Sequence, residues 1–353
     1  MQLLHTLQNI ASNVHIKSSD LCIIHPNCQP VELPGDIVTQ LQKMSQEIQY
    51  KYLNSLLQNF IYDNYYNGLI VREASKAVKT DCQILETTDF VEVDWEFYEK
   101  LHKNNKGEGW FNPNCRVLRQ ENDGSLAVQK LGLTIHIQRD RHLQLADQSA
   151  TVGDLVAIWM PPGNVQKEFY MAMGDAAGNF SSPEDYSNKV VFVYFNFSPE
   201  GAVAVMKGLT TRLNGIKVPF SFRVLYNPSN YGRYDAGILR FDKDSYELVW
   251  QVLQTVYAEN KLHFQTKVPL FTKVLAPGLA LAEEPEHKFT PQETFGMNRC
   301  QIVVNGLLEA QQKGDESPEA RMTSILKHFN LLGIDLRRPY LNPNSEDIYT
   351  PLG

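Results

Sequence analysis

The chain has 353 residues, of which 43% are hydrophobic and 21% are charged, so it contains ample material for a folded core. Its formal net charge of −7 argues against non-specific binding to nucleic acid, because no basic excess exists to neutralise phosphates. No apolar run reaches the roughly 18 residues that a membrane-spanning helix needs. We therefore expect neither nucleic acid nor a membrane as partner.

Cysteine usage and the N-terminus favour a cytoplasmic location. The 5 cysteines are scattered and form neither CxxC pairs nor His/Cys clusters, which is typical of reduced thiols rather than disulfides or a metal site. The first residues lack the charged start and apolar core of a signal peptide. No dinucleotide fingerprint, P-loop or HExxH motif occurs, so we expect no cofactor and no metal.

The N-terminal third reads as two parts. We predict a helical region in residues 1–75, where apolar side chains recur at helical spacing from Gly35 to Tyr66 and the helix breaks once. Residues 76–114 mix acidic, aromatic and basic stretches, and we predict an arm or lid-like segment. Its basic residues 100–109 are typical of an exposed loop.

Residues 115–353 are predicted to form an α+β body. Short apolar runs separated by turn signals indicate several antiparallel strands, and we expect one large, mostly antiparallel sheet with flanking helices. The alternating run 133–138 places His136 on one face of such a strand. This body is the part of the chain that we expect to carry the functional site.

The centre of this body is the stretch 188–242. Residues 189–197 are almost wholly apolar, as in a strand buried on both faces. Ser198 and Pro199 are typical of a helix start, and the spacing predicts a helix over 202–213. Two further strands are predicted over 218–226 and 236–241.

Arginines at the ends of these elements suggest an anion site. Arg223 interrupts an apolar strand, Arg233 and Asp235 follow the next turn, and Arg299 begins a later helix. Guanidinium groups stay charged and fork onto phosphate or carboxylate oxygens, and a helix start adds favourable dipole charge. The plainer alternative is that Arg233 and Asp235 pair with each other within a turn, and that Arg223 lies on an edge strand and points to water.

Six blocks of the sequence are more informative in their order than any one of them alone. They are EFYMAMGDA (168–176), VFVYFNFSPEGA (191–202), VPFSFRVLYNPSNYGRYDAGILRF (218–241), KVPLFTKVLAPGLALAEEP (267–285), FGMNRC (295–300) and GIDLRRPYLNP (333–343). In this order the blocks resemble the HopA effector family, which comprises type III secretion effectors and relatives in bacterial peptide biosynthesis. The similarity spans nearly the full length, including QYKYLNSLLQNFIYDNYYN (49–67) near the N-terminus.

The resemblance implies an α+β fold and, in the biosynthetic branch, a phosphoserine/phosphothreonine lyase. Such a protein removes phosphate from phosphorylated Ser or Thr during maturation of lanthipeptides and related peptides, leaving a dehydrated residue. The implied partners are a phosphorylated peptide or protein substrate and a kinase that would supply it. The effector branch implies instead a secreted, non-catalytic interaction protein that binds a phosphorylated or acidic partner, and this alternative stays open.

Elimination needs a base for the Cα proton, an acid for the departing phosphate and cations that hold the dianion. We predict Lys217 and Lys189 as candidate bases and His136 as the candidate acid. The phosphate-binding candidates are Arg223, Arg233 and Arg299, with Asp235 orienting Arg233. Thr134 stands where secreted phosphothreonine lyases carry a lysine two residues before their histidine, and solvent-facing roles for His136 and Lys217 remain the plainer alternatives.

Overall fold

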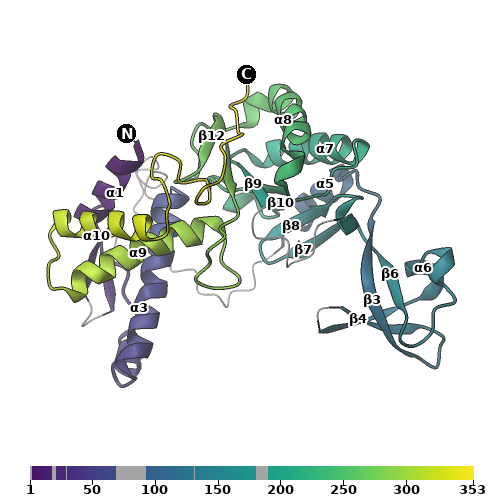
Figure 1. Ribbon diagram of the computed structural model, residues 1–353, viewed down its shortest axis with the longest axis horizontal. Helices are drawn as coiled ribbons and strands as arrows, with labels where there is room; N and C mark the ends of the chain where they lie inside the picture. Colours follow the sequence, from purple (N-terminus) through teal and green to yellow (C-terminus); the bar gives the residue numbers. More distant parts are fainter. Residues whose placement is uncertain (1, 18–20, 29, 69–92, 131, 180–189) are drawn as a thin grey trace.

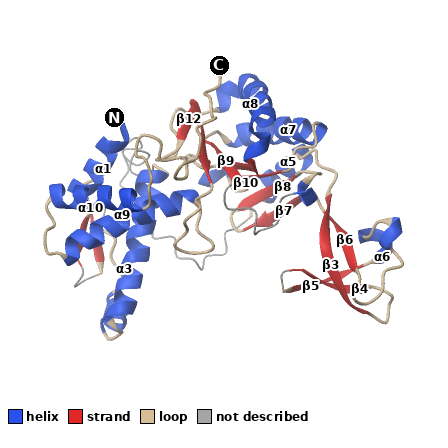
Figure 2. Ribbon diagram, in the orientation of Figure 1, coloured by secondary structure: helices blue, strands red, loops and turns tan. Residues whose placement is uncertain are grey.

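The computed structural model describes residues 2–17, 21–28, 30–68, 93–130, 132–179 and 190–353 (Figure 1). The named strands in this part of the chain all pair antiparallel, and helices surround them, which confirms the predicted α+β class (Figure 2). None of the described helices combines the length and the apolar composition that crossing a membrane requires.

The N-terminal region is helical with one short hairpin. The predicted break in the long helix is confirmed, because one helix ends at Gln42 and the next begins at Gln46. Leu7 and Leu57 lie in the same apolar core as the central sheet, so this region packs onto the body. Its elements are α1 (Gln2–Asn13), β1 (His15–Lys17), β2 (Cys22–Ile24), α2 (Gly35–Gln42), α3 (Gln46–Ile61) and the π-helix η1 (Tyr62–Tyr66).

Helix α5 (Trp95–Asn104) corrects the first half of the predicted basic loop 100–109, whereas residues 105–109 form a loop as expected. Asp94 caps this helix by accepting a hydrogen bond from the Phe97 amide (2.9 Å), and the helix packs against α7. Asn105 then lies buried and donates from Nδ2 to the Tyr170 hydroxyl (3.1 Å). Residues 69–92 of the predicted arm lie outside the described residues.

A four-stranded sheet, in the order β5-β4-β3-β6, follows α5 and stands apart from the rest of the molecule (Figure 1). We expected its strands to belong to one large sheet. They instead enclose a small core of their own around Val117, Val128 and Ile158, and the chain then passes through Pro161-Pro162. The elements are β3 (Trp110–Gln120), β4 (Leu126–Lys130), β5 (Leu133–Ile137), α6 (Arg139–His142), η2 (Leu145–Asp147) and β6 (Leu155–Met160).

The central sheet has seven strands in the order β12-β13-β9-β11-β10-β8-β7. The predicted central strands and helix are present within a few residues of their expected ends. The strands are β7 (Gly163–Gln166), β8 (Phe169–Met173), β9 (Val190–Phe195), β10 (Phe220–Leu225), β11 (Gly237–Asp242), β12 (Lys273–Ala276) and β13 (Leu279–Glu283). The helical elements are η3 (Ala177–Asn179), α7 (Pro199–Gly215), η4 (Pro228–Asn230), η5 (Lys243–Ser245), α8 (Tyr246–Asn260), η6 (Lys261–His263), α9 (Phe295–Gln312) and α10 (Pro318–Leu331).

The two faces of this sheet differ in chemistry. Along β10, Phe220, Phe222 and Val224 are buried on the face that α5 and α7 cover, whereas Ser221 and Arg223 point to the other face. The second face is only partly covered: Tyr194 on β9 contacts Phe295 of α9 and Tyr66 of η1. The polar residues on the uncovered part of this face line the pocket described next.

Candidate functional site

A pocket of about 650 Å³ lies on the partly covered face of the central sheet, and we call it the sheet-face pocket. Its floor comes from the sheet, and one wall comes from the loop that precedes α9. The lining residues are Gln166, Met171, Phe192, Tyr194, Ser221, Arg223, Ile238, Arg240, Glu284, Lys288, Pro291, Gln292, Glu293, Thr294 and Phe295. Three of these are cationic and two are carboxylates, which leaves a formal charge of +1.

Two arginines lie next to each other on the floor of the pocket. Arg223 on β10 pairs with Ile238 on β11, and Arg240 pairs with Ser221, so the two arginines are diagonal neighbours on one face. Such neighbours in an antiparallel pair lie about 7–8 Å apart between Cα atoms, well within reach of arginine side chains. Two guanidinium groups at this spacing can contact one phosphate from two sides.

One side-chain donor of Arg223 has no acceptor among the described residues. Its guanidinium stacks over the Phe169 ring at 5.1 Å, which fixes the plane of the group. Its Nε atom is buried and donates to no described residue. A buried donor on a charged group costs free energy until an acceptor reaches it, so Arg223 is suited to receive an anionic ligand.

The wall of the pocket adds the start of α9. Thr294 caps this helix by accepting from the Met297 amide (3.4 Å), so the positive end of the helix dipole is directed at the pocket. Lys288 also lines the wall and is paired with Glu284. Glu293 accepts hydrogen bonds from the Phe289 amide and from Asn298 Nδ2, both at 2.9 Å. The wall therefore carries charges of both signs.

Arg233 lies outside the sheet-face pocket, in an ion-pair cluster beyond the end of β10. It donates from Nε and Nη2 to both carboxylate oxygens of Asp235 (2.9 and 3.1 Å) and from Nη1 to Glu168 (2.8 Å). Tyr62 donates to Asp235 as well (3.0 Å). Burial acts to raise the pKa of Asp235, but the Arg233 charge and these hydrogen bonds outweigh it and hold that pKa below its usual range. The cluster thus matches the plainer alternative, in which Asp235 and Arg233 pair with each other.

Arg299 is buried and its donors are already used. It donates from Nε to the Pro339 carbonyl (2.9 Å), from Nη2 to the Leu341 carbonyl (3.2 Å) and from Nη1 to Asn298 Oδ1 (2.6 Å). Its guanidinium also stacks on the Phe295 ring at 4.8 Å. Burial lowers the pKa of Arg299 to about 10, so it stays charged at neutral pH. We call Arg299 with these two carbonyls the C-terminal clamp, because it holds the final segment against α9.

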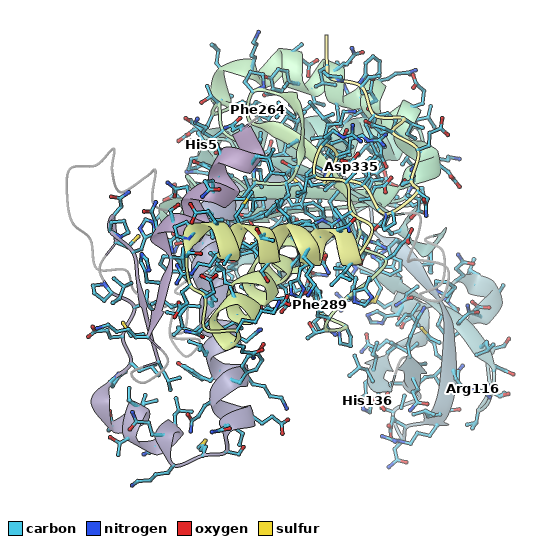
Figure 3. All side chains as sticks on the ribbon, turned by 60° about the vertical axis from the view of Figure 1, so that its left-hand side comes forward. His5, Arg116, His136, Phe264, Phe289 and Asp335 are labelled. Atoms are coloured by element: carbon cyan, nitrogen blue, oxygen red, sulfur yellow. The ribbon has the colours of Figure 1, made fainter. Side chains whose placement is uncertain are left out.

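The predicted acid His136 and the predicted base Lys217 do not join the pocket. Lys217 is exposed in the turn that precedes β10, at the end of this strand opposite to Arg233, and does not line the pocket. His136 lies on β5 of the separate sheet with 59% of its side chain exposed, 3.5 Å from Glu121 (Figure 3). Lys189 lies outside the described residues. Of the six predicted site residues that the structure describes, Arg223 is the one that lines the sheet-face pocket.

Arg240 and Lys288 are pocket residues that the sequence analysis missed. Arg240 interrupts an apolar strand in the same way as Arg223, and this signal could have revealed it. Lys288 stands in a loop between two prolines, Pro285 and Pro291, and nothing in its local pattern indicates a pocket. Within the described part of the chain, no group of His, Cys, Asp and Glu side chains is arranged to hold a metal ion.

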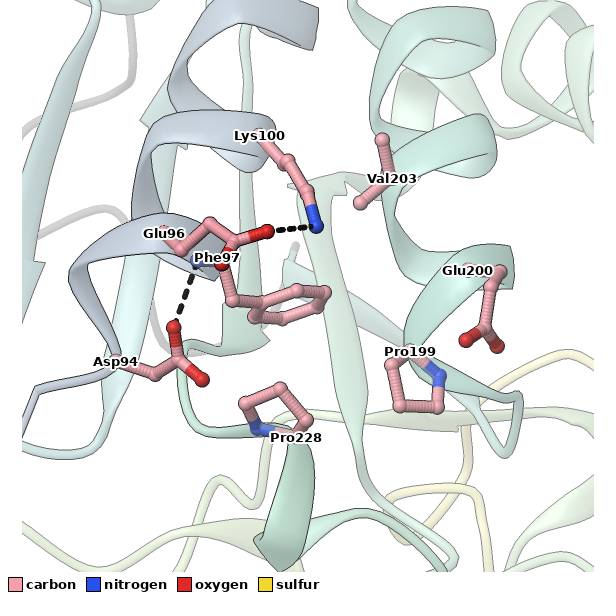
Figure 4. Close-up of a pocket in the computed structure, with 8 residues that line it drawn as sticks. All are labelled: Asp94, Glu96, Phe97, Lys100, Pro199, Glu200, Val203 and Pro228. Carbon is pink, nitrogen blue, oxygen red and sulfur yellow. Dashed lines mark hydrogen bonds and ion pairs between the residues drawn. The ribbon is translucent and has the colours of Figure 1, made fainter.

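A second pocket, of about 400 Å³, has the opposite charge (Figure 4). It lies where α5 and α7 begin and is lined by Asp94, Glu96 and Glu200, with Lys100 as its one cation among the lining residues. Glu96 and Lys100 pair at 2.7 Å. Carboxylates at helix starts stabilise the helices, and this excess of negative charge repels phosphate. The acidic pocket is therefore not a candidate for the anion.

The fold and site define an α+β protein with a cationic pocket on the open face of an antiparallel sheet. The sequence model of the HopA1 effector protein family matches residues 160–341, a segment that contains every residue of the sheet-face pocket. The chain therefore belongs to the HopA1 effector protein family, which confirms the resemblance found in the sequence.

Solved structures of two effectors are similar to this chain. One is the effector protein from Pseudomonas syringae pv. syringae strain 61, with 15% identity and a TM-score of 0.43, covering 88% of this chain and 94% of that one. The other is the effector protein from Pseudomonas syringae pv. tomato strain DC3000, with 14% identity and a TM-score of 0.42, covering 87% and 94%. No curated protein sequence matches the chain significantly.

Proposed function

We propose that the chain binds a phosphorylated serine or threonine of a peptide or protein in the sheet-face pocket and eliminates the phosphate. The observation that carries this proposal is the pair of diagonal arginines, Arg223 and Arg240, on the floor of a net cationic pocket. The buried Nε of Arg223 and the start of α9 add two further features that favour a dianion. A precursor peptide in natural-product maturation is the substrate class that the family resemblance suggests.

The proposed reaction is a β-elimination. A base takes the Cα proton, the released electron pair forms the Cα=Cβ double bond, and the Cβ–O bond breaks as phosphate leaves with its electron pair and then accepts a proton. In our assignment Arg223 and Arg240 hold the phosphate, and the Lys288 ammonium on the pocket wall donates the proton. Lys189, which precedes β9 in the sequence, stays the predicted base.

A second candidate is binding of the phosphorylated partner without turnover. One specific observation favours it: Lys288, the described lysine that lines the pocket, is already paired with Glu284 and is therefore not placed to act as a base. The two other candidates within the described residues, Lys217 and His136, lie outside the pocket. An effector that acts by occupying its partner needs only the phosphate site.

Incubation with phosphorylated peptides followed by mass spectrometry separates the two functions. We expect wild type to convert phosphoserine peptides to products that have lost phosphoric acid, and we expect the Lys189→Ala variant to bind but not convert them. Binding without any conversion by wild type would support the second candidate.

The phosphate site is tested in the same assay with Arg223→Ala and Arg240→Ala. Both variants should lose conversion and binding together, because both act on the phosphate. Arg141→Ala, at an exposed position on α6, is the matched control and should behave as wild type. Full activity in both pocket variants would remove the sheet-face pocket as the site.

A further inference from the structure

The two edge strands of the central sheet, β12 and β7, differ in whether described residues cover their outer sides. At one edge, β12 is covered by the C-terminal segment: the Leu352 amide donates to the Leu275 carbonyl (2.8 Å), and Lys273 binds Asp347 (2.8 Å) and the Tyr349 carbonyl (2.6 Å). Covering an edge in this way prevents other chains from pairing with it.

The other edge, β7, is left open among the described residues. Its four residues, Gly163–Gln166, carry no charge, and no described strand pairs with their outer side. Val165 has 45% of its surface exposed. Charges, prolines or bulges within the strand commonly protect natural edges, and β7 has none of them.

The hydrogen-bond pattern shows which backbone groups face outward. The Met173 amide donates to the Pro162 carbonyl (2.8 Å), so Pro162 and Met173 form a hydrogen-bonded pair. Antiparallel pairs alternate, and therefore Asn164 and Gln166 direct their backbone groups to β8. Gly163 and Val165 then direct their N–H and C=O groups to the outer edge.

We propose that an extended segment of the phosphorylated substrate pairs with the outer edge of β7 as an added strand. This inference rests on the proposed function, and it names how the substrate chain is held. The edge is continuous with the sheet-face pocket, because Gln166 belongs to β7 and also lines the pocket. Backbone pairing of this kind binds a chain with little demand on its side chains, as an enzyme or binding protein for flexible peptides requires.

The distance from the edge of β7 to the pocket arginines means that the paired segment lies beside the phosphorylated residue in the substrate sequence and does not contain it. An added strand would lie three strand spacings from β10, about 14 Å from the strand that carries Arg223. A phosphorylated side chain within the paired segment would not reach between Arg223 and Arg240. About four extended residues span this distance, so the phosphorylated residue lies about that far along the chain from the paired segment.

Another exposed edge, β5 of the four-stranded sheet, is a poorer candidate. Leu133 on this strand is 69% exposed, but the strand belongs to the sheet that stands apart from the pocket (Figure 1). A substrate held there would have to cross between the two sheets before it reached Arg223. Continuity with the pocket therefore favours β7.

The first test uses Val165→Pro in the full chain. Proline removes the outward N–H but none of the bonds to β8, so the sheet tolerates it better than at Asn164. We expect affinity for a long phosphoserine peptide to fall about fivefold or more, which corresponds to about one net hydrogen bond. Binding of capped phosphoserine alone should stay unchanged. Val165→Thr, which keeps the N–H, is the matched control and should bind both probes as wild type does.

The second test alters the peptide and leaves the protein untouched. Single N-methylation along one flank should weaken binding at every second residue, which is the signature of an added strand. Equal effects at all positions, or equal affinities of the long peptide and capped phosphoserine, would overturn the β7 proposal while leaving the phosphate site intact. Failure of wild type to bind any phosphorylated probe would overturn both.

Discussion

The sheet-face pocket and the C-terminal clamp both contact Phe295, and both use guanidinium groups, but for different purposes. In the clamp, Arg299 stacks on this ring and gives its donors to the Pro339 and Leu341 carbonyls and to Asn298. In the pocket, which Phe295 also lines, Arg223 stacks on Phe169 and leaves Nε without a described acceptor. The difference lies in the acceptors that the surrounding backbone supplies.

This comparison shows what decides the role of a buried guanidinium. An arginine whose donors are satisfied by carbonyls holds two segments of the chain together, and removing it leaves those carbonyls unpaired. An arginine with an unsatisfied buried donor contributes little to the fold and is available to a ligand. The first kind should therefore matter for stability and the second for binding.

The largest expected effect is on the clamp. Arg299→Met should lower the free energy of unfolding by about 3 kcal/mol or more, because two buried carbonyls lose charged hydrogen-bond donors. Urea denaturation measures this change. Arg337→Met is the matched control, since its side chain is 88% exposed, and it should change stability by less than about 0.5 kcal/mol. A small loss in Arg299→Met would mean that the clamp does not hold the C-terminal segment.

The pocket arginines should show the reverse pattern. Arg223→Ala and Arg240→Ala should each weaken binding of a phosphoserine peptide about tenfold or more, since each removes charge-assisted hydrogen bonds to the phosphate. The free energy of unfolding of Arg223→Ala should stay within about 1 kcal/mol of wild type, because its Nε has no described acceptor. Titration calorimetry and urea denaturation of the same preparations test both statements. A large loss of stability with unchanged binding would show that these arginines stabilise the fold and do not bind the phosphate.

Arg233 is a third case, in which carboxylates rather than carbonyls satisfy the guanidinium. Burial raises the pKa of nearby Asp63 from 3.8 to about 6, and Arg233 offsets only part of this effect. The folded protein therefore binds more protons than the unfolded chain between about pH 4 and 6, and stability falls as the pH rises through this range.

Asp63→Asn tests this case. The substitution should flatten the pH dependence between about pH 4 and 6 and raise stability at neutral pH by about 1–3 kcal/mol. Urea denaturation at several pH values measures both effects. An unchanged pH profile would show that the ionised Asp63 carboxylate does not destabilise the fold. The charges of the Arg233 cluster would then all be satisfied by partners, as the Arg299 charge is in the clamp.

Local patterns predicted most of the elements but only part of the site. The break before Gln46 and the strands of the central stretch follow from spacing and turn residues, which act over a few positions. The acceptors of Arg299 lie forty residues further along the chain, at Pro339 and Leu341, so no local pattern could separate it from Arg223. The four-stranded sheet was missed for a similar reason, because strand composition does not state which strands share a core.

The smallest expected effect concerns Lys217, which the sequence analysis named as a base. It follows α7 with a φ of +55°, a conformation that costs an L-residue about 1 kcal/mol and that glycine adopts freely. Lys217→Gly should therefore raise the free energy of unfolding by up to about 1 kcal/mol.

The same variant separates a structural role of Lys217 from a catalytic one. Binding and conversion of a phosphoserine peptide should stay within about twofold of wild type, because Lys217 lies in the turn before β10 and does not line the sheet-face pocket. Lys217→Ala is the matched control: it removes the same amine without relieving the backbone. Loss of conversion in both variants would restore Lys217 as the base and would move the reacting centre to the other end of β10.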